Sequence, residues 1–299
     1  MNAMLKPNQV EHPYIGGGNV AGILGLSPYK TPYAEYVNII EGRPEASAER
    51  ERFFARRKAL EPWAASLFQQ STGLRITRTN ERYQDNEFEF IKSEIDFETE
   101  DGCNGEIKTV HPLAARDWGE PGADACPVYV TAQAMHGLMV TGRRACYVQA
   151  LIGFDDDRVY RIERDEETIA VMRTKELEFW RRVQERDAPD PTASSDILHM
   201  FLRDAGTPIE ADDDIAAAYH ELVSVRKRIA PLEDEEGALK EQIKIFLRDA
   251  AQLTIDGRPV LTWKSQDSKR FDQTAFASAH PDLFSQFKTT STSRVLRIK

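Results

Sequence analysis

The pattern of apolar and polar positions divides the first half of the chain into helices and short strands. A short helix follows Gly16–Gly18 and a second spans about residues 32–41, while apolar side chains at helical spacing predict a helix over about residues 47–72. Between residues 74 and 110 the period changes to short alternating runs, Leu74–Thr77, Phe88–Ile91, Ile95–Phe97 and Gly105–Val110, separated by Asp, Asn and Gly. This alternation predicts antiparallel strands.

A second group of elements follows a loop rich in Pro and Gly between His111 and Cys126. The pattern predicts a helix from Pro127 to about Thr141, strands over about residues 144–153 and 157–164, and a helix from Asp165 to about Arg186. The order of helix, strands, helix, strands and helix predicts an α+β fold, a mixed central sheet flanked by helices. We assign this core to residues 1–190.

The remaining third of the chain has a different pattern. Prolines mark a linker, for which we set the bounds 191–210, and residues 211–299 form a C-terminal extension. Its apolar residues at spacings of three, four and seven predict a long helix or helical hairpin with a coiled-coil-like seam: Ile215, Leu222, Val225, Ile229, Leu232, Leu239, Ile243 and Phe246. Pro231 predicts a kink or a turn, and Asp256-Gly257 predicts a small terminal β-hairpin.

Composition excludes several classes of protein. The chain has 299 residues, of which 41% are hydrophobic and 29% charged, and no run approaches the roughly 18 apolar residues of a membrane helix. We therefore expect a cytoplasmic protein without a membrane partner. Three scattered cysteines do not form a disulfide framework, a zinc ribbon or an all-cysteine iron–sulfur site.

The net charge of −10 counts against a nucleic-acid partner, but the distribution of charge matters more than the sum. Basic residues cluster between Arg50 and Lys58 and again between Lys264 and Lys299. Arg50, Arg57 and Glu61 share one face of the predicted helix, so the first cluster is a candidate for holding a phosphate backbone near the site described next. A solvated charged face is the alternative, and for the second cluster it is the favoured one.

The sharpest candidate for chemistry is Asp96 followed, ten residues later, by Glu106-Ile107-Lys108. On a strand, residues 106 and 108 project from one face, and Asp96 can join them from the preceding strand. Two carboxylates beside a backbone carbonyl suit Mg²⁺ or Mn²⁺, and a neighbouring Lys can position the attacking water for phosphodiester hydrolysis. Taken alone, Glu-x-Lys is more typical of a solvated strand face.

Three further residues have two interpretations each. Glu61 lies beside Pro62 in an apolar stretch and is either a site residue or an ordinary helix-start acid. Gln133 and His136 lie three residues apart on a helix, so both side chains can face the sheet. Alternatively, Gln133 is a polar residue on a half-exposed helix face, and His136 is a satisfied core histidine. Gly16–Ala21 matches a dinucleotide fingerprint poorly, because no buried strand precedes it, so we expect no such cofactor.

Taken in order, these residues resemble the YqaJ viral recombinase family, which is similar to phage lambda exonuclease and belongs to the PD-(D/E)xK nucleases. The resemblance covers about residues 14–187 and includes, besides the residues above, the segments Ile23-Leu24-Gly25-Leu26-Ser27-Pro28-Tyr29, Gln133-Ala134-Met135-His136, Val140-Thr141-Gly142, Ile162-Glu163-Arg164-Asp165-Glu166 and Phe179-Trp180. Members commonly carry Ser-Asp after the glycines and an Arg just upstream, where this chain has Gly18-Asn19 and Glu11-His12-Pro13.

The resemblance implies a role for each matching residue. Asp96, Glu106 and the Ile107 carbonyl would bind the catalytic metal, with Glu61 holding it directly or through water. Lys108 would activate the water, and Gln133 would orient Lys108 or the scissile phosphate. We assign the DNA contacts to four residues: Asn19, Arg50, Arg57 and His136.

The resemblance further implies an Mg²⁺-dependent exonuclease, with Mn²⁺ as a possible substitute, that digests linear double-stranded DNA from the 5′ strand and leaves 3′ overhangs for single-strand annealing. It implies a homo-oligomeric ring, phage or prophage origin, and an annealing protein as partner. Two alternatives stay open: an endonuclease of a defence or restriction system, and a non-catalytic module that binds DNA or a recombination partner. The presence of Asp96, Glu106 and Lys108 together argues against the non-catalytic binding module, because buried like charges repel one another without a metal.

Overall fold

The computed structural model describes residues 13–42, 46–120 and 126–298. The chain divides into two compact units, Met1–Phe201 and Leu202–Lys299. Within the described ranges, no helix combines the length and apolarity needed to cross a bilayer.

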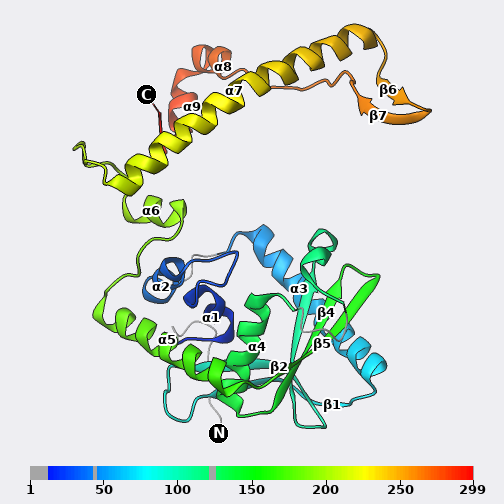
Figure 1. The fold of residues 1–299 in the computed structure, drawn as a ribbon, viewed down its shortest axis with the longest axis vertical. Coiled ribbons are helices and arrows are strands. Elements are labelled where there is room, and N and C mark those ends of the chain that lie inside the picture. Colours follow the sequence, from blue (N-terminus) through cyan, green and yellow to red (C-terminus); the bar gives the residue numbers. More distant parts are fainter. Residues whose placement is uncertain (1–12, 43–45, 121–125, 299) are drawn as a thin grey trace. The chain divides into compact units, whose positions relative to one another are not determined.

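The first unit contains a five-stranded sheet in the order β1-β2-β3-β4-β5 (Figure 1). Neighbours are antiparallel except β3 and β4, which are parallel and joined by a helical crossover. The sheet is therefore mixed, and the α+β class predicted from the sequence is confirmed. The strands are β1 (Ile76–Gln84), β2 (Lys92–Thr99), β3 (Asn104–Val110), β4 (Ala145–Ile152) and β5 (Asp156–Glu163).

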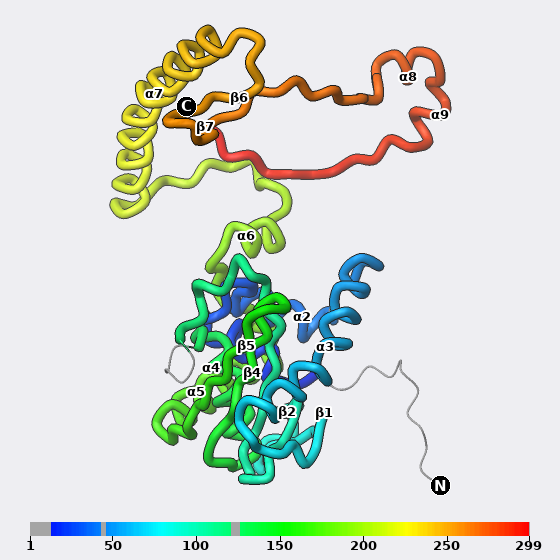
Figure 2. The backbone as a smooth tube through the Cα atoms, turned by 90° about the vertical axis from the view of Figure 1, so that its right-hand side faces the viewer, coloured from blue at the N-terminus to red at the C-terminus, as the bar shows by residue number. Residues whose placement is uncertain are grey.

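Helices cover both faces of this sheet (Figures 1 and 2). Helix α3 packs on one face against β3 and β4, while α4 packs on the other and is itself covered by α1 and α5. Nine of the fourteen residues of α4 are buried, so this helix forms the centre of the core. The helices of the unit are α1 (Gly17–Ile23), α2 (Pro32–Ile40), α3 (Ala48–Thr72), α4 (Val128–Thr141), α5 (Glu166–Glu185) and α6 (Ser194–Met200).

Local sequence signals set the ends of these helices. The side chains of Thr31, Ser47 and Asp165 accept hydrogen bonds from backbone N–H groups in the first turns of α2, α3 and α5. Gly73 and Gly142 end α3 and α4 with φ of 74° and 73°, a left-handed conformation that glycine adopts without strain. These caps explain why the predicted helix bounds agree with the structure to within one or two residues.

Two predicted segments differ from the structure. Residues 88–91 were expected to form a strand, but they close a turn between β1 and β2, because the Asp85 carboxylate accepts the N–H groups of Glu87 and Phe88. The loop between His111 and Cys126 contains a 3-10 helix, η1 (Pro112–Asp117), and its residues 121–125 lie outside the described ones.

The segment predicted to be a linker, residues 191–210, contains helix α6. This helix is bonded to α2 through Thr31 Oγ1 to Asp196 Oδ1 at 2.8 Å and through Tyr33 Oη and His199 Nδ1 at 3.0 Å. The first compact unit accordingly extends to Phe201 rather than to residue 190. The functional domain boundaries stay a prediction.

The second unit consists of one long helix and small elements. Helix α7 (Asp213–Leu247) spans 35 residues and continues through Pro231, so the turn considered there is absent. The predicted hairpin is present as β6 (Gln252–Ile255) and β7 (Arg258–Thr262), with Asp256 and Gly257 at φ of 50° and 74° in its turn. Two short helices follow, α8 (Gln273–Ala279) and α9 (Pro281–Gln286).

Candidate active site

The candidate site forms where β2 and β3 separate. The two strands pair only at Phe97–Gly105 and Glu98–Asn104, so Asp96 and Glu106 face each other one step beyond the last pair. Here a side chain replaces the missing backbone partner, because Ile107 N–H donates to Asp96 Oδ2 at 2.7 Å. The end of the ladder thus brings the two predicted carboxylates together.

Strand alternation explains which side chains share the site. Phe97 contacts Phe68 of α3, with ring centroids 4.8 Å apart, and a Cβ on Gly105 would lie 2.2 Å from the Phe97 ring. Phe97 and Gly105 therefore belong to the α3 face of the sheet. Glu106 is one residue away from Gly105 and belongs to the α4 face, where Gln133 of α4 donates to it. Asp96 faces Glu106 from β2, where the two strands separate.

A closed hydrogen-bond network joins β3 to α4. Lys108 Nζ donates to Glu106 Oε1 at 2.6 Å and to Gln133 Oε1 at 2.7 Å, and Gln133 Nε2 donates to Glu106 Oε1 at 2.7 Å. Gln133 thus contacts Lys108 directly, and its function of orienting Lys108 or the scissile phosphate stays a prediction. Both bonds to Glu106 end on Oε1, and the bond to Asp96 ends on Oδ2, so Oε2 and Oδ1 take no part in these contacts.

The charges of the site influence one another strongly. Burial, and then the negative charge of Glu106, raise the pKa of Asp96 well above its usual range. Burial alone would lower the pKa of Lys108, but the carboxylates of Glu106 and Asp96 raise it, so the ammonium stays protonated. The site therefore combines a fixed positive charge with carboxylates that repel one another.

This donor set fits a hard divalent cation. Asp96 and Glu106 supply carboxylate oxygens, and the Ile107 carbonyl points toward the same side of β3 as the N–H that Asp96 accepts. In the described part of the chain, no three His, Cys, Asp or Glu side chains converge closely enough to enclose a metal. Mg²⁺ suits such a partial set, because it usually binds one or two carboxylates and retains several waters.

Glu61 and the basic residues of α3 lie along the edge of this site. Burial raises the pKa of Glu61, the positive charge of Lys58 lowers it, and the negative charge of Glu106 raises it. Glu61 therefore interacts electrostatically with Glu106. Arg57 NH1 donates to the Thr109 carbonyl and, at 2.8 Å, to Thr109 Oγ1, next to Lys108. Arg50 is exposed and stacks over Phe54 at 5.7 Å, so only Arg57 is fixed to the site.

A groove of about 480 Å³ extends from the site to the glycine-rich segment before α1. Asp96 and Gln133 line it together with Gly16–Asn19, Lys92 and Arg82. Gly17 allows a close approach here, because a Cβ would lie 3.2 Å from Gln133 Cγ. The groove gives a ligand access to Asp96.

Asn19 lines this groove but is only 5% exposed, because its side chain is bonded within the protein. Gly16 N–H donates to Asn19 Oδ1 at 3.2 Å, and Asn19 Nδ2 donates to Glu35 Oε2 at 2.8 Å. Lys30 Nζ donates to the other oxygen of Glu35 at 2.9 Å. These bonds fix the side chain of Asn19 against the backbone of the glycine-rich segment. Its contact with DNA stays a prediction.

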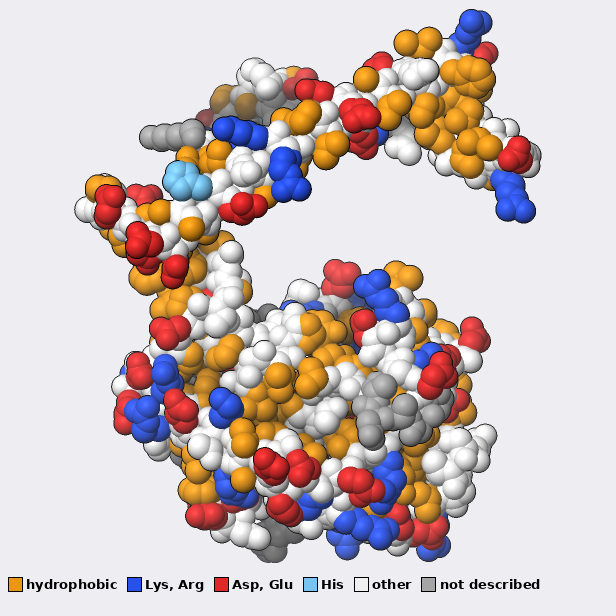
Figure 3. Space-filling view, viewed as in Figure 1, with side chains coloured by type: hydrophobic (Ala, Val, Ile, Leu, Met, Phe, Trp, Pro, Cys, Tyr) orange, Lys and Arg blue, Asp and Glu red, His pale blue; other side chains and the backbone are white. Residues whose placement is uncertain are grey.

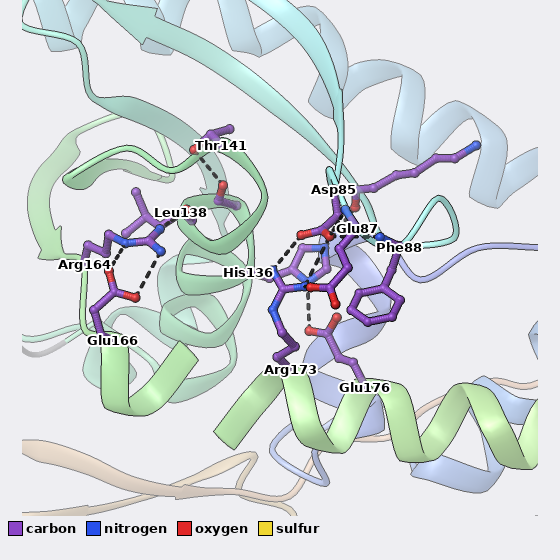
Figure 4. A network of polar contacts seen from close by, with 12 residues as sticks. Asp85, Glu87, Phe88, His136, Leu138, Thr141, Arg164, Glu166, Arg173 and Glu176 are labelled. Carbon is purple, nitrogen blue, oxygen red and sulfur yellow. Dashed lines mark hydrogen bonds and ion pairs between the residues drawn. The ribbon is translucent and has the colours of Figure 1, made fainter. Parts of the chain in front are cut away.

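His136 does not meet the expectation of a DNA contact. It is completely buried, with Nδ1 2.9 Å from Glu176 Oε1 and Nε2 2.9 Å from the Lys92 carbonyl oxygen (Figure 4). Burial lowers the pKa of His136, but the charge of Glu176 raises it above its ordinary value. The alternative interpretation, a satisfied core histidine, describes this residue.

Sequence reasoning did not include Lys92 or Arg82, which line the groove beside the predicted residues. Lys92 lies four residues before Asp96 on β2 and so has the same strand parity, a signal that the sequence contains. Arg82 lies on β1, opposite Glu94, to which its Nε donates at 3.2 Å. Arg82 lines the groove because of the register of the β1–β2 hairpin, and no local sequence pattern reveals that register.

The chain matches known proteins over much of its length. Residues 8–144 match the model of the YqaJ-like viral recombinase domain. The chain is 27% identical over 294 residues to the uncharacterized protein YqaJ of Bacillus subtilis (strain 168), covering 95% of this chain and 91% of that protein. These matches confirm the resemblance predicted from the sequence.

Two solved structures are similar at the level of backbone arrangement. An alkaline exonuclease from Laribacter hongkongensis superimposes with a TM-score of 0.47 and 20% identity, covering 59% of this chain and 90% of that one. A phage-related exonuclease from Haemophilus somnus 129PT superimposes with a TM-score of 0.41 and 15% identity, covering 59% and 96%.

Proposed function

Because residues 8–144 match the model of the YqaJ-like viral recombinase domain, we propose that this protein is a metal-dependent deoxyribonuclease that digests linear double-stranded DNA. The observation that carries the proposal is the network in which Lys108 Nζ lies 2.6 Å from Glu106 Oε1 and 2.7 Å from Gln133 Oε1, beside Asp96. A positive charge fixed next to paired carboxylates suits metal-assisted phosphodiester hydrolysis.

Each residue of the network has a task in this reaction. Asp96, Glu106 and the Ile107 carbonyl would hold Mg²⁺ or Mn²⁺, with Glu61 acting through water. The bound ion supplies Lewis-acid stabilisation of negative charge on the phosphoryl group and a nucleophile at neutral pH. Lys108 holds a positive charge toward the attacking side, and Gln133 fixes the direction of its ammonium group.

The DNA would approach along the groove that Asp96 lines. Lys92 and Arg82 line this groove and offer positive charge to the phosphates, although the net charge of the chain is −10. Arg57, bonded to Thr109 at the other side of Lys108, would hold a second phosphate. Because each phosphate that these basic residues neutralise releases counterions, binding should weaken as salt is raised.

The finer features of the proposal derive from the family resemblance. We infer digestion from the 5′ strand, 3′ overhangs as the product, a ring of identical chains for processivity, and an annealing protein as partner in the bacterial cytoplasm. An endonuclease of a defence system is the second candidate within the same chemistry. A purely binding module is disfavoured, because Asp96, Glu106 and Lys108 converge instead of lying apart.

A digestion experiment separates these possibilities. We expect the protein with Mg²⁺ to degrade a linear duplex labelled at one 5′ end, to release label early, and to leave a covalently closed circle of the same sequence intact. Addition of a chelator should stop digestion. Cutting of the circle would favour the endonuclease over the exonuclease. Salt-sensitive binding without any cutting would favour the non-catalytic binding module.

A further inference from the structure

Helix α7 carries a strict seven-residue repeat along its whole length. With Ile215 as the first position of the repeat, the first and fourth positions are apolar throughout the helix with the exception of Glu236. The first positions are Ile215, Leu222, Ile229, Glu236 and Ile243, and the fourth are Ala218, Val225, Leu232, Leu239 and Phe246. A repeat sustained over five heptads is typical of coiled coils.

The seam made by these ten residues has no partner within the described second unit. Leu232 and Phe246 are 62% and 76% exposed, and only Val225 and Ile243 are half-buried. Within the second unit, α7 makes no extensive contact with another described helix or strand, and Figure 3 shows hydrophobic side chains alternating with charged ones on its surface. A seam of this length in contact with water requires another helix to cover it.

The residues that flank the seam indicate what that helix is. In a parallel coiled coil, the seventh position of one heptad lies near the fifth position of the next heptad on the partner. If the partner is a second copy, Glu221 faces Arg226, Arg228 faces Glu233, and Glu235 faces Lys240. Each of these pairs joins opposite charges, so the helix is complementary to itself in register.

We propose that α7 associates with α7 of a second copy of this chain as a parallel two-stranded coiled coil. Three of the five first positions are Ile and two of the five fourth positions are Leu, and Ile at first positions with Leu at fourth positions favours two strands over three or four. Glu236, the one charged residue of the seam, is neutralised by Lys240, whose Nζ lies 2.6 Å from Glu236 Oε1. Pro231 lies at the third position of its heptad, on the side away from the seam.

This association is independent of the proposed nuclease activity, and the full chain can test it by light scattering. Leu232→Asp places a charge in the seam, and we expect the mass at micromolar concentration to fall by half, to that of the assembly that forms without the seam. Ile245→Asp is the matched control, because Ile245 is 74% exposed on the same helix but lies outside the seam. A mass that Leu232→Asp leaves unchanged would overturn the proposal.

Charge reversal tests the identity of the partner. Arg228→Glu should weaken association about tenfold in low salt, and Arg228→Glu combined with Glu233→Arg should restore it. Lys227→Glu, which makes the same change of charge at the outer sixth position, should have little effect. Equal effects of Arg228→Glu and Lys227→Glu would contradict the pairing of these flanking residues.

Orientation is tested with Leu222→Cys. Cys103 and Cys146 are buried but Cys126 is half-buried, so Cys126 is replaced by Ser in both the Leu222→Cys chain and its control. In a parallel pair in register, the two new thiols meet across the seam and form a disulfide under mild oxidation, whereas the control without Leu222→Cys should not cross-link. Failure of Leu222→Cys to cross-link while the chain associates would show an antiparallel arrangement and overturn the parallel one.

Discussion

Glu106→Gln should reduce digestion of linear duplex DNA by about 100- to 1,000-fold while the chain remains folded. The substitution keeps the size of the side chain and an oxygen that can accept from Lys108 and Gln133. It removes one of the two negative charges that attract the divalent cation. Initial rates at saturating Mg²⁺, normalised to the folded fraction from circular dichroism, measure the effect.

Glu100→Gln is the matched control for this substitution. Glu100 follows β2 in the same hairpin but is exposed, and its Oε2 lies 3.4 Å from Arg75, away from the site. We expect its rate to equal that of the unsubstituted chain. Equal rates of digestion by Glu106→Gln and Glu100→Gln would show that Glu106 does not bind the catalytic metal.

Glu176→Gln should destabilise the first unit by about 2 kcal/mol near pH 6. Glu176 is completely buried and pairs with His136, whose other ring nitrogen lies against the Lys92 carbonyl at the start of β2. In the described chain the second oxygen of Glu176 has no hydrogen-bond partner, so the ion pair with His136 is the main compensation for burying this charge. Urea unfolding followed by circular dichroism measures the loss, with exposed Glu178→Gln on the same helix as control.

The pH dependence of this loss has a definite sign. Because the pKa of His136 is raised in the folded state, the pair contributes its full stability below the unfolded pKa of about 6.5 and loses it as pH rises through the folded value. The difference in unfolding free energy between the unsubstituted chain and Glu176→Gln should therefore shrink between about pH 6 and pH 9. A difference that stays constant or grows over this range would show that His136 is neutral in the folded protein.

Much of the fold follows from local sequence signals. Capping residues and glycines set the helix ends, and alternation placed Glu106 and Lys108 on one strand face, where the structure joins them to Gln133. The coiled-coil-like seam of the C-terminal extension was visible in the spacing of its apolar residues, and it forms one face of α7.

Other features depend on contacts between distant segments, which periodicity does not reveal. The buried partner of His136 is Glu176, forty residues later on α5, so the sequence left a DNA contact and a satisfied core histidine both open for this residue. The turn at residues 85–90 depends on a single Asp85 side chain, which outweighs the strand-like alternation of the Phe residues. Arg82 joins the groove only through the register of β1 and β2.

The central claim is that the paired carboxylates make a metal-dependent site for phosphodiester hydrolysis. Its most direct test compares the unsubstituted chain and Asp96→Asn on one linear duplex, each with Mg²⁺ and with chelator. We expect digestion only by the unsubstituted chain with Mg²⁺, because Asn can still accept the Ile107 N–H but carries no charge for the cation. Comparable Mg²⁺-dependent digestion by Asp96→Asn, or digestion by the unsubstituted chain in chelator, would contradict the account.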